Sequence, residues 1–259
     1  MLGKDIRLGR IRDRDTGKYI IVPLDHGVTV GPVKGLNDLM KTVGSVAEGG
    51  ATAILMHKGT VASAYPGHER DLGLILHLSA STEFGNTEDC KVLVSSVREA
   101  IKTGADAVSL HINLGSKSEP EMLHDLGMVS QECSEWGVPL VCMAYVRGNA
   151  PSETEDAAHA VRVVSELGAD VVKCDYTGDP DSFRTVVEAS LVPVVVAGGP
   201  VMESDRDILD MVYGAMSAGA SGVSIGRNIF QHRNPEKITA AIADIVKNGS
   251  DAEEAGRLL

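Results

Sequence analysis

The feature that most constrains the fold is a short pattern that the chain repeats along its length. Each copy has a glycine followed by small residues and then an aliphatic run, at residues 48–54, 102–108, 166–172 and 217–223, with a proline-containing fifth copy at 135–141. Glycine readily takes the left-handed conformation just beyond a helix, and the aliphatic run then begins a strand. The pattern therefore predicts repeated helix-to-strand junctions.

Helix start signals lie between these junctions. Asp179 and Asn234 each precede a proline, and Ser118 and Ser152 each precede a glutamate by three residues, which is the spacing of a capping box. Within residues 155–168 the apolar positions recur at helical spacing, which indicates a helix with one buried face.

The strands expected between these helices are apolar on both faces, as in a parallel sheet covered by helices. They are residues 19–24, 51–56, 73–77, 106–111, 139–144, 170–173, 193–197 and 222–225. Eight such units in about 250 residues predict a single (β/α)8 TIM barrel. It would occupy residues 1–259, with 1–18 as an N-terminal lead-in and 249–259 as a C-terminal tail. An open doubly wound sheet is the alternative, disfavoured because the first strand lacks a G-x-G-x-x-G turn.

Charge and composition exclude several classes of partner. The chain carries 24 Lys and Arg against 36 Asp and Glu, a net charge of −12, so no nucleic-acid partner is expected. No apolar run approaches the roughly 20 residues of a membrane span, so no membrane partner is expected either. The four cysteines have no C-x-x-C spacing, and residues 1–15 lack an apolar leader. These features predict a cytoplasmic protein.

Lys173 is the most informative candidate residue. A β/α barrel builds its active site at the carboxyl ends of the strands, and Lys173 ends the apolar run 170–173. Burial there would lower its pKa, and a neutral amine can form a Schiff base with a ketone. The alternative is a lysine that reaches solvent at the rim. Lys58, one residue past its strand, is expected to bind substrate anions or to depress the pKa of Lys173.

Asp25 and Tyr145 are the candidates for proton transfer. They follow different strands and would face the same mouth of the barrel, and a carboxylate and a phenol suit acid–base roles. Each has a simpler alternative, because Asp25 could cap a turn and Tyr145 could pack inside the barrel.

Glycines after the last two strands predict a phosphate site. Backbone N–H groups at Gly198, Gly199 and Gly226 could cradle a phosphate, and Arg227 would add a forked donor. The alternative is a pair of turns without a ligand.

Four histidines near strand ends leave a metal-dependent lyase as a competing hypothesis. His26, His57, His77 and His111 could hold zinc, which would stabilise an enolate in place of an iminium. None of them shows a local pair spacing, and an isolated histidine more often makes a hydrogen bond. The preferred interpretation therefore has no metal.

Six motifs together resemble the archaeal-type class I aldolases of the DeoC and fructose-bisphosphate aldolase superfamily, over nearly the whole chain. They are VPLDHGV at 22–28, HKG at 57–59, YVRG at 145–148, VKCDYTGD at 172–179, AGGP at 197–200 and VSIGRNIFQ at 223–231. The resemblance implies Lys173 as the Schiff-base lysine, Asp25 as proton acceptor and Tyr145 as proton donor, with no cofactor. It also implies substrate or phosphate binding by His26, Gly27, Val28, Thr29, Lys58, Arg147, Gly198, Gly199, Gly226 and Arg227.

The likeness is greatest to the group of this family that makes 2-amino-3,7-dideoxy-D-threo-hept-6-ulosonate. It implies transfer of a three-carbon ketone unit from 6-deoxy-5-ketofructose 1-phosphate to L-aspartate 4-semialdehyde, on the route to 3-dehydroquinate and aromatic amino acids. It also implies a homo-oligomer such as a decamer. The alternatives are cleavage of fructose 1,6-bisphosphate, condensation of the semialdehyde with dihydroxyacetone phosphate, and a non-catalytic barrel that binds a sugar phosphate.

Overall fold

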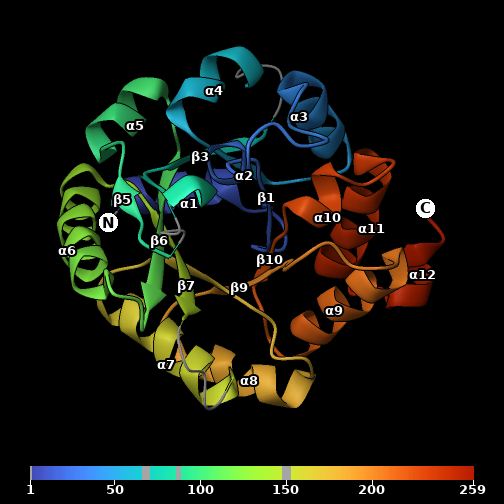
Figure 1. The fold of residues 1–259 in the computed structure, drawn as a ribbon. Coiled ribbons are helices and arrows are strands. Elements are labelled where there is room, and N and C mark those ends of the chain that lie inside the picture. The colour runs from blue at the N-terminus through green and yellow to red at the C-terminus, as the bar shows by residue number, and fades with distance from the viewer. Residues whose placement is uncertain (1, 66–70, 86–88, 148–152) are drawn as a thin grey trace.

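Eight parallel strands close into a barrel inside a ring of helices, as Figure 1 shows for the computed structural model. The structure describes residues 2–65, 71–85, 89–147 and 153–259. Around the barrel the strands are β1 (Tyr19–Pro23), β10 (Gly222–Ser224), β9 (Val194–Ala197), β8 (Val171–Cys174), β7 (Leu140–Val146), β6 (Ala107–Leu114), β3 (Gly73–His77) and β2 (Ala53–Met56). The predicted barrel is confirmed. Gly148, the last residue of the YVRG motif, and Ser152, an expected helix cap, lie outside the described residues.

The outer helices are α3 (Leu39–Glu48), α4 (Lys58–Ala64), α5 (Val97–Thr103), α6 (Glu119–Trp136), α7 (Glu153–Glu166), α8 (Pro180–Ala189), α9 (Asp205–Ser217) and α11 (Pro235–Asn248). Asp179 and Asn234 cap α8 and α11 by accepting backbone N–H bonds, as the sequence predicts. Ser118 occupies the N-cap of α6 without a side-chain capping bond. None of the described helices has the length and apolarity needed to cross a lipid bilayer.

The helix-to-strand glycines have the predicted conformation. Gly50, Gly104, Gly137, Gly168 and Gly219 all have φ between +63° and +103°. A side chain would be strained there, so glycine allows each helix to end and the chain to turn directly into the next strand.

Short elements close the two ends of the barrel. α1 (Leu2–Ile11) crosses the amino-terminal end, where Lys4 Nζ lies 2.8 Å from Asp170 Oδ2 and Arg7 Nη1 donates to the Gly137 carbonyl over 2.8 Å. Ile11 is fully buried against the barrel interior. At the carboxyl end lie α2 (Gly27–Val30), the strand pair β4 (Ser79–Ala80) and β5 (Val92–Leu93), the 3₁₀ turn Glu83–Gly85 and α10 (Arg227–Phe230). The C-terminal α12 (Ala252–Gly256) packs on α9 and α11.

Two strands are longer than the sequence indicates. The expected strand ends near His111 and Ala144 are wrong, because β6 and β7 stay paired as far as Leu114 and Val146. The polar residues in these two extensions, such as Tyr145, stay paired in the sheet. Inward-facing side chains at the mouth of the barrel border the cavity, so a polar side chain there is not buried in the apolar core. His111 lies inside β6, as expected, and Tyr145 projects from β7 and not from a loop.

Candidate active site

A cavity of ≈ 370 Å³ opens at the carboxyl ends of the strands. Of the residues that the sequence singles out, it brings together Asp25, His26, Thr29, Tyr145, Arg147, Lys173, Gly198, Gly199, Gly226 and Arg227. Successive side chains of a strand point to opposite faces, so every second residue of each strand faces the barrel axis. The cavity is therefore the open end of the barrel interior.

Three expected binding residues do not line this cavity. Gly27 and Val28 lie in α2, where the Val28 side chain is 41% exposed. Lys58 begins α4, and its Nζ lies 3.1 Å from Glu99 Oε2. A substrate role for these residues stays a prediction, whereas the ion pair already gives the Lys58 charge a partner.

Lys173 projects from β8 to the floor of the cavity. Its register neighbours are Met143 on β7 and Val195 on β9, and it is only 7% exposed. Burial lowers its pKa below 10.5, although the negative charges of Asp25 and Asp175 partly oppose this. A lowered pKa leaves more of the amine neutral and nucleophilic.

Asp25 follows β1 and faces two histidines. Its Oδ1 lies 3.3 Å from His26 Nδ1, and its Oδ2 lies 3.7 Å from His77 Nε2. Burial would raise its pKa, but His26, His77 and Lys173 outweigh burial and hold the pKa well below 3.8. Asp25 is therefore an ionised carboxylate close to the amine, as a proton acceptor requires.

Burial favours the neutral imidazole forms of His77 and His111, which also line the cavity. Burial lowers the pKa of His77 to about 4, and its Nδ1 pairs with Ser109 Oγ at 2.8 Å. Burial also lowers the pKa of His111 well below 6.5, and its Nε2 lies 3.0 Å from Asn113 Oδ1. Across the described ranges, no group of three His, Cys, Asp or Glu side chains could hold a metal ion.

Tyr145 supplies a phenol to the same cavity. Burial, assisted by the charge of Asp175, raises its pKa well above 10, so the phenol keeps its proton. The His111 ring centroid lies 4.9 Å from that of Tyr145, and the Arg147 guanidinium lies 5.0 Å from the Tyr145 ring. A protonated phenol fixed by two neighbours suits a proton donor.

Asp175 is a cavity residue to which sequence reasoning assigned no role. It lies two residues after Lys173, so the two-residue period of a strand could have indicated that both face the axis. Loss of surrounding water raises its pKa above 3.8, while Lys173 and two arginines oppose the rise. Ser224 of β10 and Lys91, close to β5, also line the cavity and were missed.

The predicted phosphate loops lie side by side. Gly199 has φ +62°, and a Cβ on Gly226 would lie 2.7 Å from His26 Cε1. Arg227 Nη2 donates to the Gly199 carbonyl over 3.0 Å. The buried Asn228 donates to the carbonyls of Gly198 and Pro200 over 2.7 and 2.8 Å, which joins the loop after β9 to α10. Sequence reasoning did not identify Asn228.

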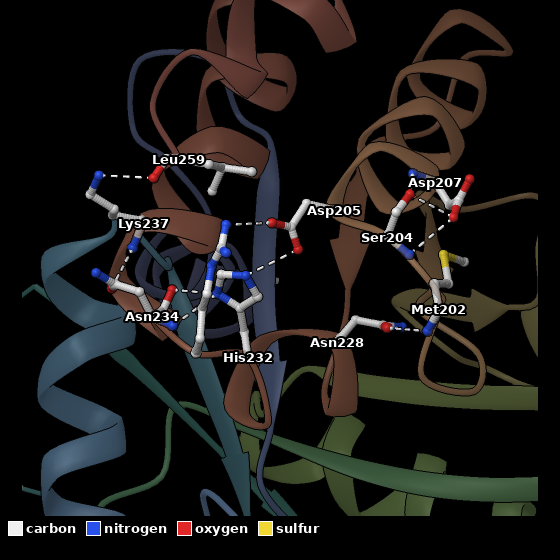
Figure 2. A network of polar contacts seen from close by, with 10 residues as sticks. Met202, Ser204, Asp205, Asp207, Asn228, His232, Asn234, Lys237 and Leu259 are labelled. Carbon is white, nitrogen blue, oxygen red and sulfur yellow. Dashed lines mark hydrogen bonds and ion pairs between the residues drawn. The ribbon is translucent and has the colours of Figure 1, made fainter.

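Figure 2 shows how the chain beyond these loops is anchored. Asn228 Oδ1 accepts a 2.8 Å bond from the Met202 backbone N–H, and Ser204 and Asp207 form a capping box at the start of α9. Asp205 Oδ1 lies 3.1 Å from His232 Nε2. These contacts fix the segments on both sides of the paired glycine loops.

The charge of Asp175 gives a testable pH dependence. Because this carboxylate raises the pKa of Lys173, Asp175→Asn should lower that pKa further and keep the amine neutral at lower pH. The acid limb of Schiff-base formation, measured by borohydride trapping against pH, should move to lower pH. Asp210→Asn on the exposed face of α9 is the matched control and should leave the limb in place. If the acid limb in Asp175→Asn stays in place or moves to higher pH, the coupling between Asp175 and Lys173 is contradicted.

An eight-stranded β/α barrel that gathers a desolvated lysine, a carboxylate and a phenol in one cavity has the architecture of a class I aldolase. Comparison with known families agrees, since the family "DeoC/LacD family aldolase" matches residues 19–232. The chain belongs to this family, as its motifs predict.

Individual relatives refine this assignment. The chain is 42% identical, over 98% of its length and 95% of the relative's, to a 2-amino-3,7-dideoxy-D-threo-hept-6-ulosonate synthase of Halobacterium salinarum. It is 40% identical, over 95% and 90%, to a 2-amino-4,5-dihydroxy-6-oxo-7-(phosphonooxy)heptanoate synthase of Streptomyces griseus. A solved archaeal fructose-1,6-bisphosphate aldolase, with its catalytic lysine bound to the carbinolamine intermediate, superposes with a TM-score of 0.87 at 34% identity. That match covers 94% of this chain and 99% of the other.

Proposed function

We propose that this protein is a Schiff-base transaldolase that makes 2-amino-3,7-dideoxy-D-threo-hept-6-ulosonate. The donor would be 6-deoxy-5-ketofructose 1-phosphate and the acceptor L-aspartate 4-semialdehyde. The observation that carries the proposal is Lys173, a buried amine at the floor of a cavity that also contains Asp25 and Tyr145. The 42% identity to a synthase of that name supports the choice of product.

The reaction follows from the chemistry of an imine. Lys173 Nζ adds to the donor ketone, and loss of water leaves an iminium. Removal of the β-hydroxyl proton then breaks the adjacent carbon–carbon bond, and its electron pair moves into the iminium to form an enamine. The enamine attacks the acceptor aldehyde, the new alkoxide takes a proton, and water releases the product. Asp25 is placed to accept protons near the amine, and Tyr145 is placed to donate one.

The product's structure shows which part of the donor is transferred. Its carbonyl is flanked by a terminal methyl group, so the transferred unit is the unphosphorylated end of 6-deoxy-5-ketofructose 1-phosphate. The phosphate leaves with the other fragment, which departs as an aldehyde. In the alternative condensation with dihydroxyacetone phosphate, by contrast, the phosphate stays on the lysine-bound half.

The test combines covalent trapping with product analysis. The purified protein should gain the mass of the donor fragment after borohydride treatment, and should convert donor plus L-aspartate 4-semialdehyde to the seven-carbon amino acid. Chelation should leave both results unchanged. Trapping and turnover only with dihydroxyacetone phosphate, or only with fructose 1,6-bisphosphate, would select one of the alternative aldolases. Binding of a sugar phosphate without any adduct would overturn the enzymatic proposal.

The loops after β9 and β10 are the proposed site for phosphate on a lysine-bound ketone. Arg227→Ala removes a charge-assisted donor, worth about 1.5 to 3 kcal/mol, so half-maximal trapping should need at least roughly tenfold more dihydroxyacetone phosphate. Unphosphorylated hydroxyacetone should be nearly unaffected. Arg184→Ala on α8 is the matched control. Equal losses of trapping for the two ketones would mean that these loops do not bind the phosphate.

We propose further that the protein acts in the cytoplasm as a homo-oligomer such as a decamer. Its cysteines are free thiols, which suits a reducing compartment. Met128 and Trp136 of α6 are 54% and 43% exposed, and an assembly could cover such apolar side chains. Sedimentation velocity would determine the assembly.

A further inference from the structure

Asp175 brings a carboxylate to the cavity, and the proposed reaction gives it no role. It follows β8 directly, is exposed, and lines the same cavity as Lys173 and Tyr145. Within the described ranges of the chain, no hydrogen bond or ion pair occupies this carboxylate. It is therefore available to a ligand that enters the cavity.

Strand register sets Asp175 beside Tyr145. Met143 of β7 is paired with Lys173 of β8, so two residues further along both strands the facing positions are Tyr145 and Asp175. After burial, the negative charge of Asp175 has the largest effect on the pKa of the Tyr145 phenol. Residues two apart in an extended chain share a face, so Asp175 lies beyond Lys173 on the side of the cavity mouth.

The other carboxylates among the described residues of the cavity lining are placed differently. Asp25 faces His26 and His77. Glu83 belongs to the 3₁₀ turn between β4 and β5, in the segment that follows β3. Asp175 is thus the carboxylate that stands next to the proposed proton donor, at the junction of β7 and β8.

The positive charge around Asp175 decreases when the lysine-bound ketone becomes an enamine. Lys173 is the cation with the largest effect on the pKa of Asp175, followed by Arg147. The Nε of Arg147 lies 2.8 Å from Asp89 Oδ1, so part of its charge is already neutralised. The nitrogen of an enamine on Lys173 is neutral. The carboxylate of Asp175 can then pair with a cation on the incoming aldehyde.

The acceptor of the proposed reaction carries such a cation. In L-aspartate 4-semialdehyde the α-ammonium nitrogen is three bonds from the aldehyde carbon, and the aldehyde oxygen becomes the alkoxide that Tyr145 protonates. An acceptor that directs this oxygen to the Tyr145 phenol can place its ammonium group against the neighbouring Asp175. Neither half of the ketone donor carries a cation.

We propose that Asp175 binds the α-ammonium group of the acceptor and makes the protein selective for an amino-acid aldehyde. The proposal rests on the transaldolase function above. A charge-assisted hydrogen bond between an ammonium group and a carboxylate contributes at least roughly tenfold in selectivity. The same aldehyde without its amino group leaves this carboxylate without a partner in a recess that is partly shielded from water.

Two aldehydes that differ only in the amino group provide the test. They are L-aspartate 4-semialdehyde and succinate semialdehyde, compared with one donor at a pH above the acid limb of trapping. The wild-type protein should prefer the first, and in Asp175→Asn the ratio of the two kcat/KM values should fall at least tenfold. Effects of the substitution on imine formation are common to both aldehydes and cancel in the ratio. Both aldehydes also carry the carboxylate, so its binding cancels as well.

Two control variants show whether the effect belongs to Asp175. Glu83→Gln removes the other exposed carboxylate of the cavity, and Asp210→Asn removes a surface charge on α9, so both should keep the wild-type ratio. Borohydride trapping of the ketone should persist in Asp175→Asn, which reports a folded active site. A wild-type protein without preference, an unchanged ratio in Asp175→Asn, a fall in Glu83→Gln instead, or loss of trapping would overturn the ammonium site.

Failure of the proposed function is distinguishable from failure of this site. If the wild-type protein traps ketones but turns over neither aldehyde, the transaldolase assignment fails. Calorimetry then compares the binding of L-homoserine and 4-hydroxybutanoate, the alcohol analogues of the two aldehydes. At least tenfold tighter binding of L-homoserine, with the preference lost in Asp175→Asn, keeps an ammonium site at Asp175. Equal binding of the two, or binding of neither, rejects it.

Discussion

Lys173→Met is expected to abolish both the borohydride adduct and turnover. Methionine has a side chain of similar length and suits an apolar site, so the barrel should keep its packing between Met143 and Val195 while losing the amine. Removing a covalent nucleophile costs on the order of 10⁴- to 10⁶-fold in kcat. Peptide mass spectrometry after borohydride treatment with the donor should place the adduct of the wild-type protein on Lys173. Steady-state assay of the variant measures the loss.

The matched control is Lys58→Met. The structure places Lys58 outside the cavity with its charge paired to Glu99, so this variant should keep the adduct on Lys173. An adduct that persists in Lys173→Met and maps to Lys58 would reverse the assignment. Turnover that needs a metal and proceeds without an adduct would instead support a metal-dependent lyase.

Tyr145→Phe should lower turnover by about 10²- to 10⁴-fold, the range of general acid–base groups. The phenol keeps its proton because burial and Asp175 raise its pKa, so removing the hydroxyl removes a proton donor while the ring remains against His111. Trapping of the ketone by borohydride should survive, since Lys173 forms the imine. Single-turnover kinetics alongside trapping would separate the two steps.

Tyr213→Phe, on the exposed part of α9, is the control for this second variant. It should behave as the wild-type protein in both assays. Full turnover in Tyr145→Phe would make Tyr145 a packing residue of the barrel interior. Loss of trapping together with turnover would place Tyr145 in imine formation.

Local sequence already determines the repeating unit of this protein and the position of Lys173 at the end of a strand. Glycines such as Gly104 and Gly168 adopt positive φ because only glycine does so without strain, and the aliphatic runs after them have nowhere to be buried except a two-sided sheet. The same reasoning places Lys173 at the end of such a run. Asp25, Tyr145 and the paired glycine loops converge on it because parallel strands end on one side of a barrel.

Tertiary structure alone decides which polar residues near the strand ends reach the cavity. The lengths of β6 and β7 depend on pairing between them, so Tyr145 projects from a strand although the sequence placed it just beyond the expected strand end. Lys58 is turned away by its pairing with Glu99, while Lys91 is brought in by contacts from Asn113 and Arg147 to Asp89. These contacts join residues that are tens of positions apart. A local pattern carries no information about such pairs, because their energies arise only after the barrel has closed.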